Sequence, residues 1–496
     1  MSRPVRLAAG VLLVGFGLVA LAVGWQGAGA RVDATAHAFI NDDRPGINGH
    51  NSPAALADPA RPDVIAVADR IDSPNIGCSV SLSVNRGVTW DLVEPPLAPD
   101  AANCYWPDVA FAPDGDLLVL ATAMGGRFTQ PLGVWLHRRQ GLQPDGPPVR
   151  VLGPHAFHAA LGVDGDRVVV AYVQVKPEVA ERPLGFPPAP NPLMVVTSAD
   201  GGRTFGEPVA VGEADRLVTE PSVVTGPGGL VVVSALDLGE DLANYEGGHQ
   251  GQAGPAPDGH WRVVTWTSRD GGASFGPTAV VTEDLVIPQR IYVDIGAPRP
   301  GLARDGRSGR LYATWESGRG ARRDVFLASS GDDGATWSAP RPIVELPGTQ
   351  TLPTVGVAPG GRVDVVFYDR SGDRTDQNTE VVVASSWDQG QSFSTGTVSV
   401  RRFDSRIGFG AFQGLPVLGT NLAVVSQPGR AAVFWSDTRR GTIDDGIQDL
   451  AVALVDIEES GRTRWPLVGL GLLLVAPGAW LLVHALRAPR PAVRRT

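Results

Sequence analysis

The chain has 496 residues and a formal net charge of −10 at pH 7. Hydrophobic residues make up 43% of it and charged residues 19%, a balance that favours a buried core and excludes a disordered chain. The negative charge and the lack of a basic stripe argue against nucleic acid as a partner. The 62 glycines and 42 prolines indicate many turns between short strands.

The N-terminal segment is predicted to direct export. Arg3 and Arg6 precede an uncharged run, Leu7–Trp25, and small residues follow at 27–30. This order is typical of a secretory signal peptide over residues 1–30, and the length of the run leaves an N-terminal anchor as the alternative.

A second apolar run, Trp465–Leu486, is long enough for a bilayer core. Arg487, Arg490, Arg494 and Arg495 follow it. The charges predict a transmembrane helix at 462–486 with a basic cytoplasmic tail at 487–496. The expected location is therefore the cell membrane, with residues 31–461 outside the cell.

Between these ends one motif recurs five times. An apolar run ends in Ser, a polar turn with Asp and Gly follows, and Thr or Ser then precedes an aromatic residue. The copies are Ser83–Trp90, Ser198–Phe205, Ser268–Phe275, Ser330–Trp337 and Ser386–Phe393, with Asn85 in place of the aspartate in the first. Asp can accept bonds from turn amides and Gly allows a positive φ, so the motif is predicted to close a hairpin rather than to perform chemistry.

Four strands can be assigned around each motif, which predicts an all-β propeller of four-stranded antiparallel blades. Seven units begin near His50, Tyr105, His155, Thr219, Asp294, Thr351 and Ala411. The last unit lacks an outer strand. Because an open edge invites aggregation, Val32–Asn41 is predicted to supply that strand and close the ring.

The five copies resemble the Asp-box, or bacterial neuraminidase repeat, of the sialidase superfamily. The resemblance covers about residues 40 to 457. It implies a propeller, with six blades as the alternative count because the sialidases have six. It also implies a glycan or glycoconjugate as partner and, if the chain is an enzyme, a glycoside hydrolase of exo-α-sialidase type.

In such a blade the starts of first strands and the loops from second to third strands share one face, and the motif hairpins lie on the other. Cys78 and Cys104 are the two cysteines of the chain, and both fall on the first face. A single pair in an exported domain predicts a disulfide rather than a zinc site, which needs more ligands.

The resemblance implies a Tyr nucleophile paired with Glu, an Asp acid/base and an arginine clamp for a sugar carboxylate. Tyr292 and Glu220 are the candidate pair, and Asp108 and Asp69 are further catalytic candidates. Guanidinium groups match carboxylates in two bonds each. The candidate substrate-binding residues are Arg70, Arg319, Arg370 and Arg439.

Other interpretations stay open. Acidic residues followed by Arg recur at the same point of four blades, as expected for salt bridges and loop caps. Where the family carries its N-terminal arginine, this chain has His50–Pro53, which favours a non-catalytic glycan- or protein-binding propeller. No metal or other cofactor is expected. Ca²⁺ in the acidic loops Asp369–Glu380 or Asp437–Asp449 is the alternative, and the oligomeric state is open.

Overall fold

The computed structural model describes residues 3–24, 29–41, 48–93, 97–125, 130–174, 192–214, 216–239, 261–285, 299–319, 322–408, 418–460 and 465–487. The chain divides into two compact units, residues 32–457 and a unit that joins residues 1–31 with residues 458–496.

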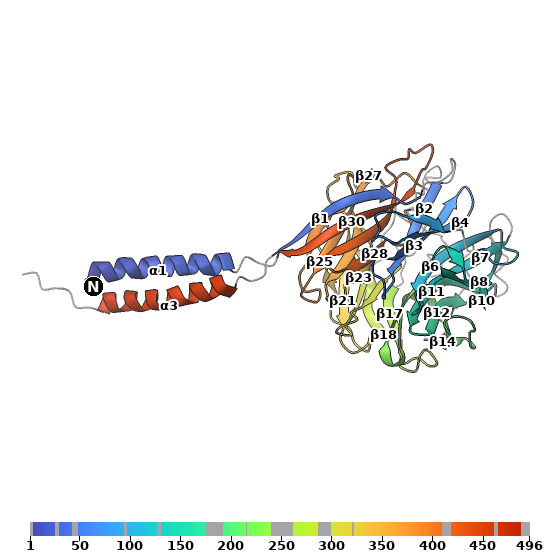
Figure 1. The fold of residues 1–496 in the computed structure, drawn as a ribbon, viewed down its shortest axis with the longest axis horizontal. Coiled ribbons are helices and arrows are strands. Elements are labelled where there is room, and N and C mark those ends of the chain that lie inside the picture. The colour runs from blue at the N-terminus through green and yellow to red at the C-terminus, as the bar shows by residue number, and fades with distance from the viewer. Residues whose placement is uncertain are drawn as a thin grey trace, which may run out of the picture. The chain divides into compact units, whose positions relative to one another are not determined.

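The larger unit is a propeller whose described strands form seven antiparallel sheets, each with a path of four strands (Figure 1). The prediction of seven blades is therefore confirmed, and the six-blade alternative is wrong.

Blades 1 to 3 follow one another along the chain. Blade 1 contains β2 (Asn48–Ala57), β3 (Ile65–Ser73), β4 (Gly77–Ser83) and β5 (Asp91–Val93). Blade 2 contains β6 (Asn103–Phe111), β7 (Leu117–Gly125), β8 (Gln130–Gln140) and β10 (Val149–Leu152), and β9 (Gln143–Pro144) also pairs with β8. Blade 3 contains β11 (Ala156–Asp164), β12 (Arg167–Gln174), β13 (Leu193–Ser198) and β14 (Val209–Val211).

Blades 4 to 6 repeat this order. Blade 4 contains β15 (Leu217–Gly226), β16 (Leu230–Gly239), β17 (Trp261–Ser268) and β18 (Ala279–Leu285), with a 3₁₀ turn, Pro227–Gly229, between the first two. Blade 5 contains β19 (Gly301–Arg304), β20 (Leu311–Arg319), β21 (Arg322–Ser330) and β22 (Arg341–Pro342). Blade 6 contains β23 (Gln350–Val357), β24 (Val363–Asp369), β25 (Asn378–Ser386) and β26 (Ser394–Thr397), and β27 (Phe403–Asp404) also pairs with β25.

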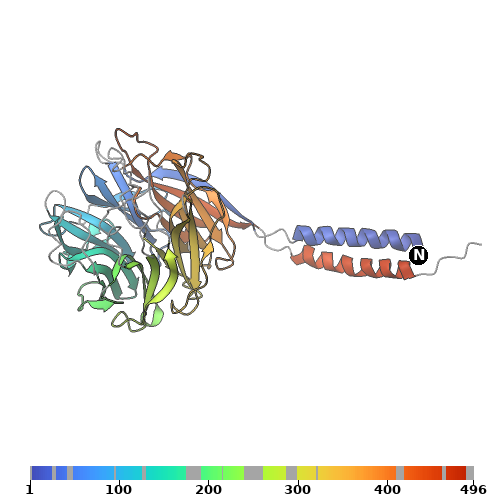
Figure 2. The ribbon, with the colours of Figure 1, turned by 180° about the vertical axis from the view of Figure 1, so that it is seen from behind.

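Blade 7 combines the two ends of the propeller. Its strand order is β1 (Gly29–Phe39), β30 (Asp449–Ser460), β29 (Arg430–Asp437) and β28 (Ala423–Gln427). Figure 2 shows the blue β1 beside the red β30. The Ile40 amide continues the pairing by donating to the Leu450 carbonyl at 2.9 Å. The predicted closure by the N-terminal strand is thus confirmed. The predicted unit starts at Asp294 and Ala411 lie outside the described residues.

Apolar clusters fill the interfaces between neighbouring blades. At the closure of the ring, Ile65 and Val67 of blade 1 pack in one cluster with Ala432 and Phe434 of blade 7. Equivalent clusters join each of the other neighbouring pairs. Alternate buried residues of the Val- and Ala-rich strands therefore pack neighbouring blades together. They do not form one central core.

The motif closes its hairpin through side-chain hydrogen bonds, as predicted. In blade 4 the Ser268 hydroxyl donates to Asp270 Oδ1 at 2.7 Å and accepts from the Gly272 amide at 2.8 Å. Asp270 also accepts from the amide of Ser274 at 2.9 Å and from its hydroxyl at 2.5 Å. Phe275 packs on the apolar cluster shared with blade 3. Every residue type of the motif therefore has a structural role.

The smaller unit contains the helices α1 (Arg3–Gly24) and α3 (Trp465–Arg487). They pack closely, since a Cβ on Gly478 would lie 2.9 Å from the Leu13 Cβ and from the Val14 amide nitrogen. A bilayer span requires about 20 consecutive apolar residues in one helix. Among the residues that the structure describes, no helix has the required length and apolar character. The predicted single-pass location in the cell membrane, with the membrane as a partner of the C-terminal helix, is therefore wrong.

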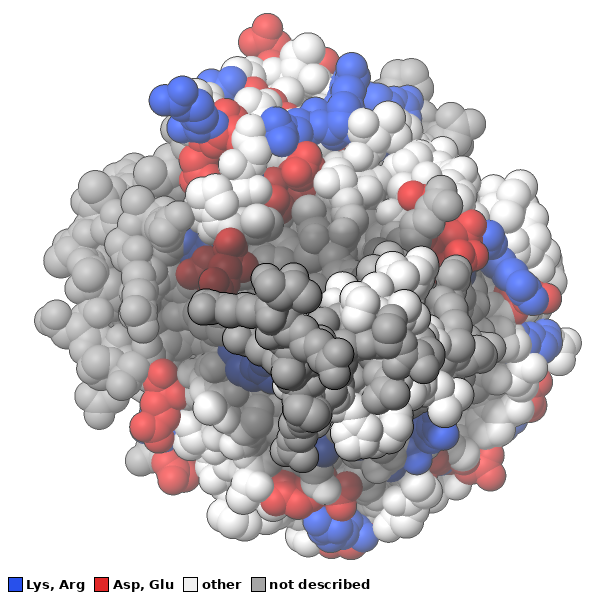
Figure 3. All heavy atoms as spheres, turned by 90° about the vertical axis from the view of Figure 1, so that its left-hand side faces the viewer, with Lys and Arg blue, Asp and Glu red and all other residues white. Residues whose placement is uncertain are grey.

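Charged side chains of both signs are interspersed over the described residues on the face in Figure 3. This distribution agrees with the sequence, which lacks a basic stripe that could bind a polyanion.

Candidate functional site

Strand register separates the two faces of the ring. Within blade 1, Asn51 pairs with Arg70, whereas Ile65 pairs with Ser83 at the start of the motif. The start of a first strand therefore lies beside the end of the second strand, at the opposite end of the blade from the hairpin. We call these ends the site face and the hairpin face.

A β-bulge interrupts the first strand of five blades near the site face. The register of blades 1, 2, 3, 4 and 6 shifts at this point, and each bulge holds a non-glycine residue in the left-handed region. These residues are Ser52 (φ 52°), Trp106 (52°), His158 (48°), Glu220 (53°) and Leu352 (52°). Bulges re-aim side chains, and such backbone strain clusters at functional positions.

Three of the bulge residues meet across blades 2, 3 and 4. The rings of Trp106 and His158 stack with centroids 4.2 Å apart and an interplanar angle of 15°. His158 Nδ1 lies 3.3 Å from Glu220 Oε1 and 3.1 Å from the Thr219 hydroxyl. The Arg70 guanidinium of blade 1 lies 5.1 Å from the centroid of the Trp106 ring. We call Arg70, Trp106, His158 and Glu220 the rim row.

Arg299 lies next to the rim row, immediately before β19 of blade 5. Its Nε donates to the Pro221 carbonyl at 3.0 Å and to the Ser222 hydroxyl at 3.2 Å. Its Nη2 lies 3.8 Å from Asp108 Oδ2 of blade 2, and that oxygen accepts from the Leu161 amide of blade 3 at 2.9 Å. Because blades 2 and 5 are not neighbours in the ring, these contacts place Arg299 near the ring axis.

Burial and nearby charges shift the titration of this region. Burial, and then the charges of Arg70 and Arg299, lower the pKa of His158 to about 3. Burial raises the pKa of Asp108, although the Arg299 charge opposes the shift. Burial also raises the pKa of Tyr105, whose ring lies under Arg70. At neutral pH the His158 ring is therefore uncharged, and Asp108 keeps its proton to a higher pH than an ordinary aspartic acid.

Asp69 lies deeper in blade 1. Its Oδ2 is 2.5 Å from His50 Nδ1, and its Oδ1 accepts from the Ser79 hydroxyl. The side chains of both His50 and Asp69 are at most 1% exposed. Asp69 therefore holds the start of β2 against the end of β3.

The predicted disulfide between Cys78 and Cys104 is confirmed, with the two Cα atoms 5.4 Å apart. Cys78 is the strand partner of Arg70, and Cys104 directly precedes Tyr105. The disulfide therefore ties the strand that pairs with the Arg70 segment to the start of β6, which carries Trp106.

The four candidate arginines do not share one environment. Arg70 Nη2 lies 2.9 Å from Asp72 Oδ2 within the site region. The other two with described side chains lie in blades 6 and 7, where each contacts an aspartate of its own loop. Arg370 donates to the Asp376 carbonyl at 3.1 Å, and Arg439 donates to Asp437 at 2.9 Å. Arg319 ends β20, and its side chain lies outside the described residues.

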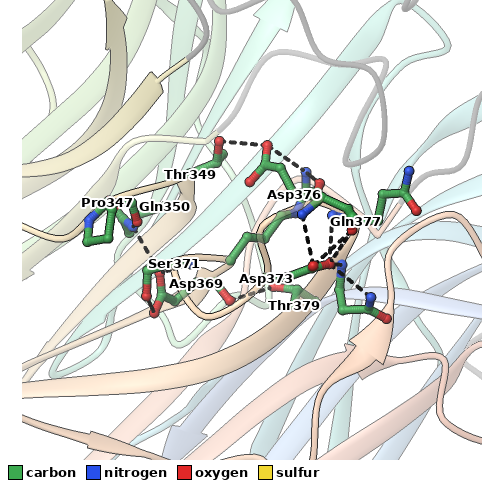
Figure 4. Close-up of polar contacts among 12 residues, drawn as sticks. Pro347, Thr349, Gln350, Asp369, Ser371, Asp373, Asp376, Gln377 and Thr379 are labelled. Carbon is green, nitrogen blue, oxygen red and sulfur yellow. Dashed lines mark hydrogen bonds and ion pairs between the residues drawn. The ribbon is translucent and has the colours of Figure 1, made fainter.

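The blade 6 loop is an internally bonded turn (Figure 4). Gln350 donates to Asp369 at 2.9 Å, and the Thr349 hydroxyl donates to Asp376 at 2.9 Å. Asp373 accepts from the amide and side chain of Asn378 at 2.7 and 2.9 Å. Over the described residues, no group of three His, Cys, Asp or Glu side chains is placed to hold a metal ion. The carboxylates of this loop thus accept hydrogen bonds from side chains and amides of their own blade.

Tyr292 lies outside the described residues, so Glu220 is placed without its predicted partner. Sequence reasoning missed Arg299 and the contacts of Trp106 and His158. A signal was present, because four of the five bulge residues directly precede proline, as in Trp106–Pro107 and Glu220–Pro221. A residue before proline is restricted in its backbone conformation, and its recurrence in first strands marks the bulges.

No family model matches the sequence, and no curated protein matches it. Solved structures do resemble the chain. A protein of unknown function from Dyadobacter fermentans has a TM-score of 0.48 at 13% identity, over 86% of this chain and 99% of that one. An ulvan lyase has a TM-score of 0.49 at 11% identity, over 87% and 96%. A Hadza microbial sialidase has a TM-score of 0.43 at 13% identity, over 78% and 73%.

Proposed function

We propose that the chain is a glycan-acting propeller whose ligand contacts the rim row on the site face. The observation that carries the proposal is the meeting of Trp106, His158 and Glu220, from three blades, at strained bulge positions beside Arg70 and Arg299. Aromatic, acidic and cationic side chains are the groups that recognise and transform sugars. The five motif copies, which resemble the Asp-box of sialidases, support the same class of ligand.

The reaction class we propose is glycoside hydrolysis of the exo-sialidase type. Asp108 is the proposed proton donor, because burial raises the pKa of its carboxyl above the ordinary value. Glu220, only 3% exposed, supplies the second carboxyl group. Tyr292, which lies outside the described residues, stays the proposed nucleophile, since tyrosine is a known departure from the two-carboxylate scheme.

A panel of fluorogenic glycosides that includes a sialoside tests this function on the full-length protein. Turnover by the wild type is expected, and Glu220→Gln should lower kcat by roughly 100-fold or more. The matched control is Glu207→Gln, which changes an exposed glutamate outside the site and should leave kcat unchanged. Failure of the wild type to cleave any glycoside would exclude the hydrolase assignment.

A non-catalytic binding propeller is the second candidate. It is favoured by His50, which stands where the resemblance implies an arginine and is held, unexposed, against Asp69. That position therefore offers no guanidinium to a sugar carboxylate. Binding of glycans on an array, without cleavage of any of them, is the outcome that this candidate predicts.

A further inference from the structure

The geometry points to His158 as the group that accepts a proton from the ligand, through Nε2, with Glu220 as its positioning residue. The inference rests on the proposed function, because it assigns a chemical step to the same rim row. A role for this histidine does not follow from the resemblance to sialidases, which implies tyrosine, glutamate, aspartate and arginine.

The contacts of Nδ1 favour one tautomer of His158. Nδ1 lies 3.3 Å from Glu220 Oε1 and 3.1 Å from the Thr219 hydroxyl. We assign the hydrogen to Nδ1, because a carboxylate at Glu220 would accept and not donate, and the lone pair is then on Nε2. Within the part of the chain that the structure describes, no side chain or backbone group bonds to Nε2. The free lone pair is therefore the one available to a ligand.

Packing holds the ring in this orientation. One face of His158 stacks on Trp106 at 4.2 Å, and the Arg70 guanidinium also lies over the Trp106 ring. The backbone of His158 and that of Glu220 are both left-handed, at φ 48° and 53°. A strand residue adopts this conformation only where its surroundings enforce it. The two side chains are thus directed at each other by their backbones.

The neutral charge state leaves the Nε2 lone pair available, but a pKa of about 3 makes the ring a weak base, so proton transfer depends on the Glu220 carboxylate beside Nδ1. Burial and the charges of Arg70 and Arg299 lower the pKa of His158 to about 3, so the ring is neutral at pH 7. When a ligand hydroxyl or a bound water gives up its proton, the O–H bond breaks with the electron pair left on oxygen. An N–H bond forms at Nε2, and the positive ring lies beside the Glu220 carboxylate. The deprotonated oxygen bonds to the anomeric carbon as the bond from that carbon to the leaving oxygen breaks with its electron pair. Asp108 protonates the leaving oxygen, and the proton on Nε2 then passes to the Asp108 carboxylate.

The first test needs no ligand. Long-range ¹⁵N–¹H NMR on the full chain with ¹⁵N-labelled histidine reports which ring nitrogen is protonated, and loss of a signal set in His158→Gln assigns the residue. We expect a neutral ring with hydrogen on Nδ1 from pH 5 to 8, and a weaker preference for that tautomer in Glu220→Gln. Hydrogen on Nε2, or a charged ring at pH 7, would overturn the inference.

The second test uses the fluorogenic glycoside that the wild type cleaves best. His158→Ala should lower kcat at least about 100-fold with a smaller change in KM, and added imidazole should restore part of the rate. His158→Gln, which keeps a polar side chain, checks the loss in a variant less disruptive to packing. His155→Ala is the matched control, and it should stay within about twofold of the wild type. Circular dichroism and melting curves establish that each variant is folded.

The outcomes separate the two proposals. A wild-type protein that cleaves no glycoside refutes the proposed function, and proton transfer by His158 falls with it. A wild-type protein that cleaves a glycoside, together with a His158→Ala variant of undiminished kcat, refutes only the role of His158. Loss of rate in His158→Ala with imidazole rescue supports both.

Discussion

Asn85 occupies the position that an aspartate holds in the other four motif hairpins, and it makes the corresponding contacts. Its Oδ1 accepts from the Thr89 amide at 2.9 Å, and its Nδ2 donates to the Thr89 hydroxyl at 2.8 Å. In blade 5, Asp332 accepts from the amide of Thr336 at 3.0 Å and from its hydroxyl at 2.6 Å. The amide thus preserves the geometry of the hairpin while reversing one hydrogen bond.

The charge of the motif aspartates should appear in the pH dependence of stability. The Thr336 hydroxyl, and then the Thr336 amide, lower the pKa of Asp332 to about 2 from an ordinary value of 3.8. A folded-state pKa below the unfolded value adds stability that is present above pH 4 and is lost as the pH falls toward 2. We expect Asp332→Asn to lower the melting temperature modestly at pH 7 and not at pH 2, as measured by thermal denaturation.

Asp332→Ala is the comparison variant. It removes both acceptor oxygens, so its melting temperature should fall further than that of Asp332→Asn at pH 7. Equal melting temperatures for the two variants would show that the hydrogen bonds to this side chain do not stabilise the fold.

At the scale of the hairpin, the fourth residue after the serine is glycine for two reasons. Gly202 has φ +84°, and a Cβ there would lie 2.4 Å from Leu136 Cδ2 of the preceding blade. The motif hairpin therefore packs against the blade before it as closely as a glycine allows.

Gly202→Ala should destabilise the protein by about 1–3 kcal/mol, because it combines left-handed strain with a steric overlap. Gly206→Ala in the same hairpin is the control, since the nearest atom to a Cβ there is the Thr197 carbonyl oxygen at 3.7 Å. Urea denaturation measures both variants. A Gly202→Ala midpoint that matched that of Gly206→Ala would contradict the packing argument.

The strands and hairpins were predictable because their signals are local. Alternating apolar residues, and Asp and Gly at fixed spacing, specify each element from neighbouring positions. The rim row is different. Trp106 and His158 are 52 positions apart in the numbering, and they stack only because two blades are set side by side with both strands bulged. Arg299 contacts blade 2 from blade 5, which no local pattern indicates.

At the scale of the whole molecule, the ring is held closed by β1 and by the apolar cluster between blades 7 and 1. Val32 packs against the buried cluster between blades 6 and 7, and the Thr35 hydroxyl donates to the Leu454 carbonyl at 3.2 Å. Without β1, the outer edge of β30 would be exposed to other chains.

Deletion of residues 32–41 should therefore lower the melting temperature by more than about 5 °C and increase aggregation on heating. His37→Ser, an exposed change in the same strand, should leave the melting temperature nearly unchanged. Scanning calorimetry with light scattering measures both effects. An unaltered melting curve for the deletion variant would mean that β1 does not secure the ring.

The number of blades and the closing strand were predictable because a repeat must form a complete ring. The location was not predictable in this way. The apolar composition of the two ends suggested membrane spans, but no described helix has the length and apolar character that a span requires. The separate environments of the candidate arginines could not be predicted from the sequence either. The recurring Asp and Arg pattern places Arg370 and Arg439 in loops where the carboxylates of Asp376 and Asp437 lie beside them.

The pairing of β1 with β30 also bears on how the protein is made. A ribosome releases β1 among the first segments of the propeller, whereas β30 follows more than 400 residues later. Blade 7 can form only once nearly all of the propeller has been synthesised. Until then β1 has no partner strand, so completion of the ring is a late step in folding.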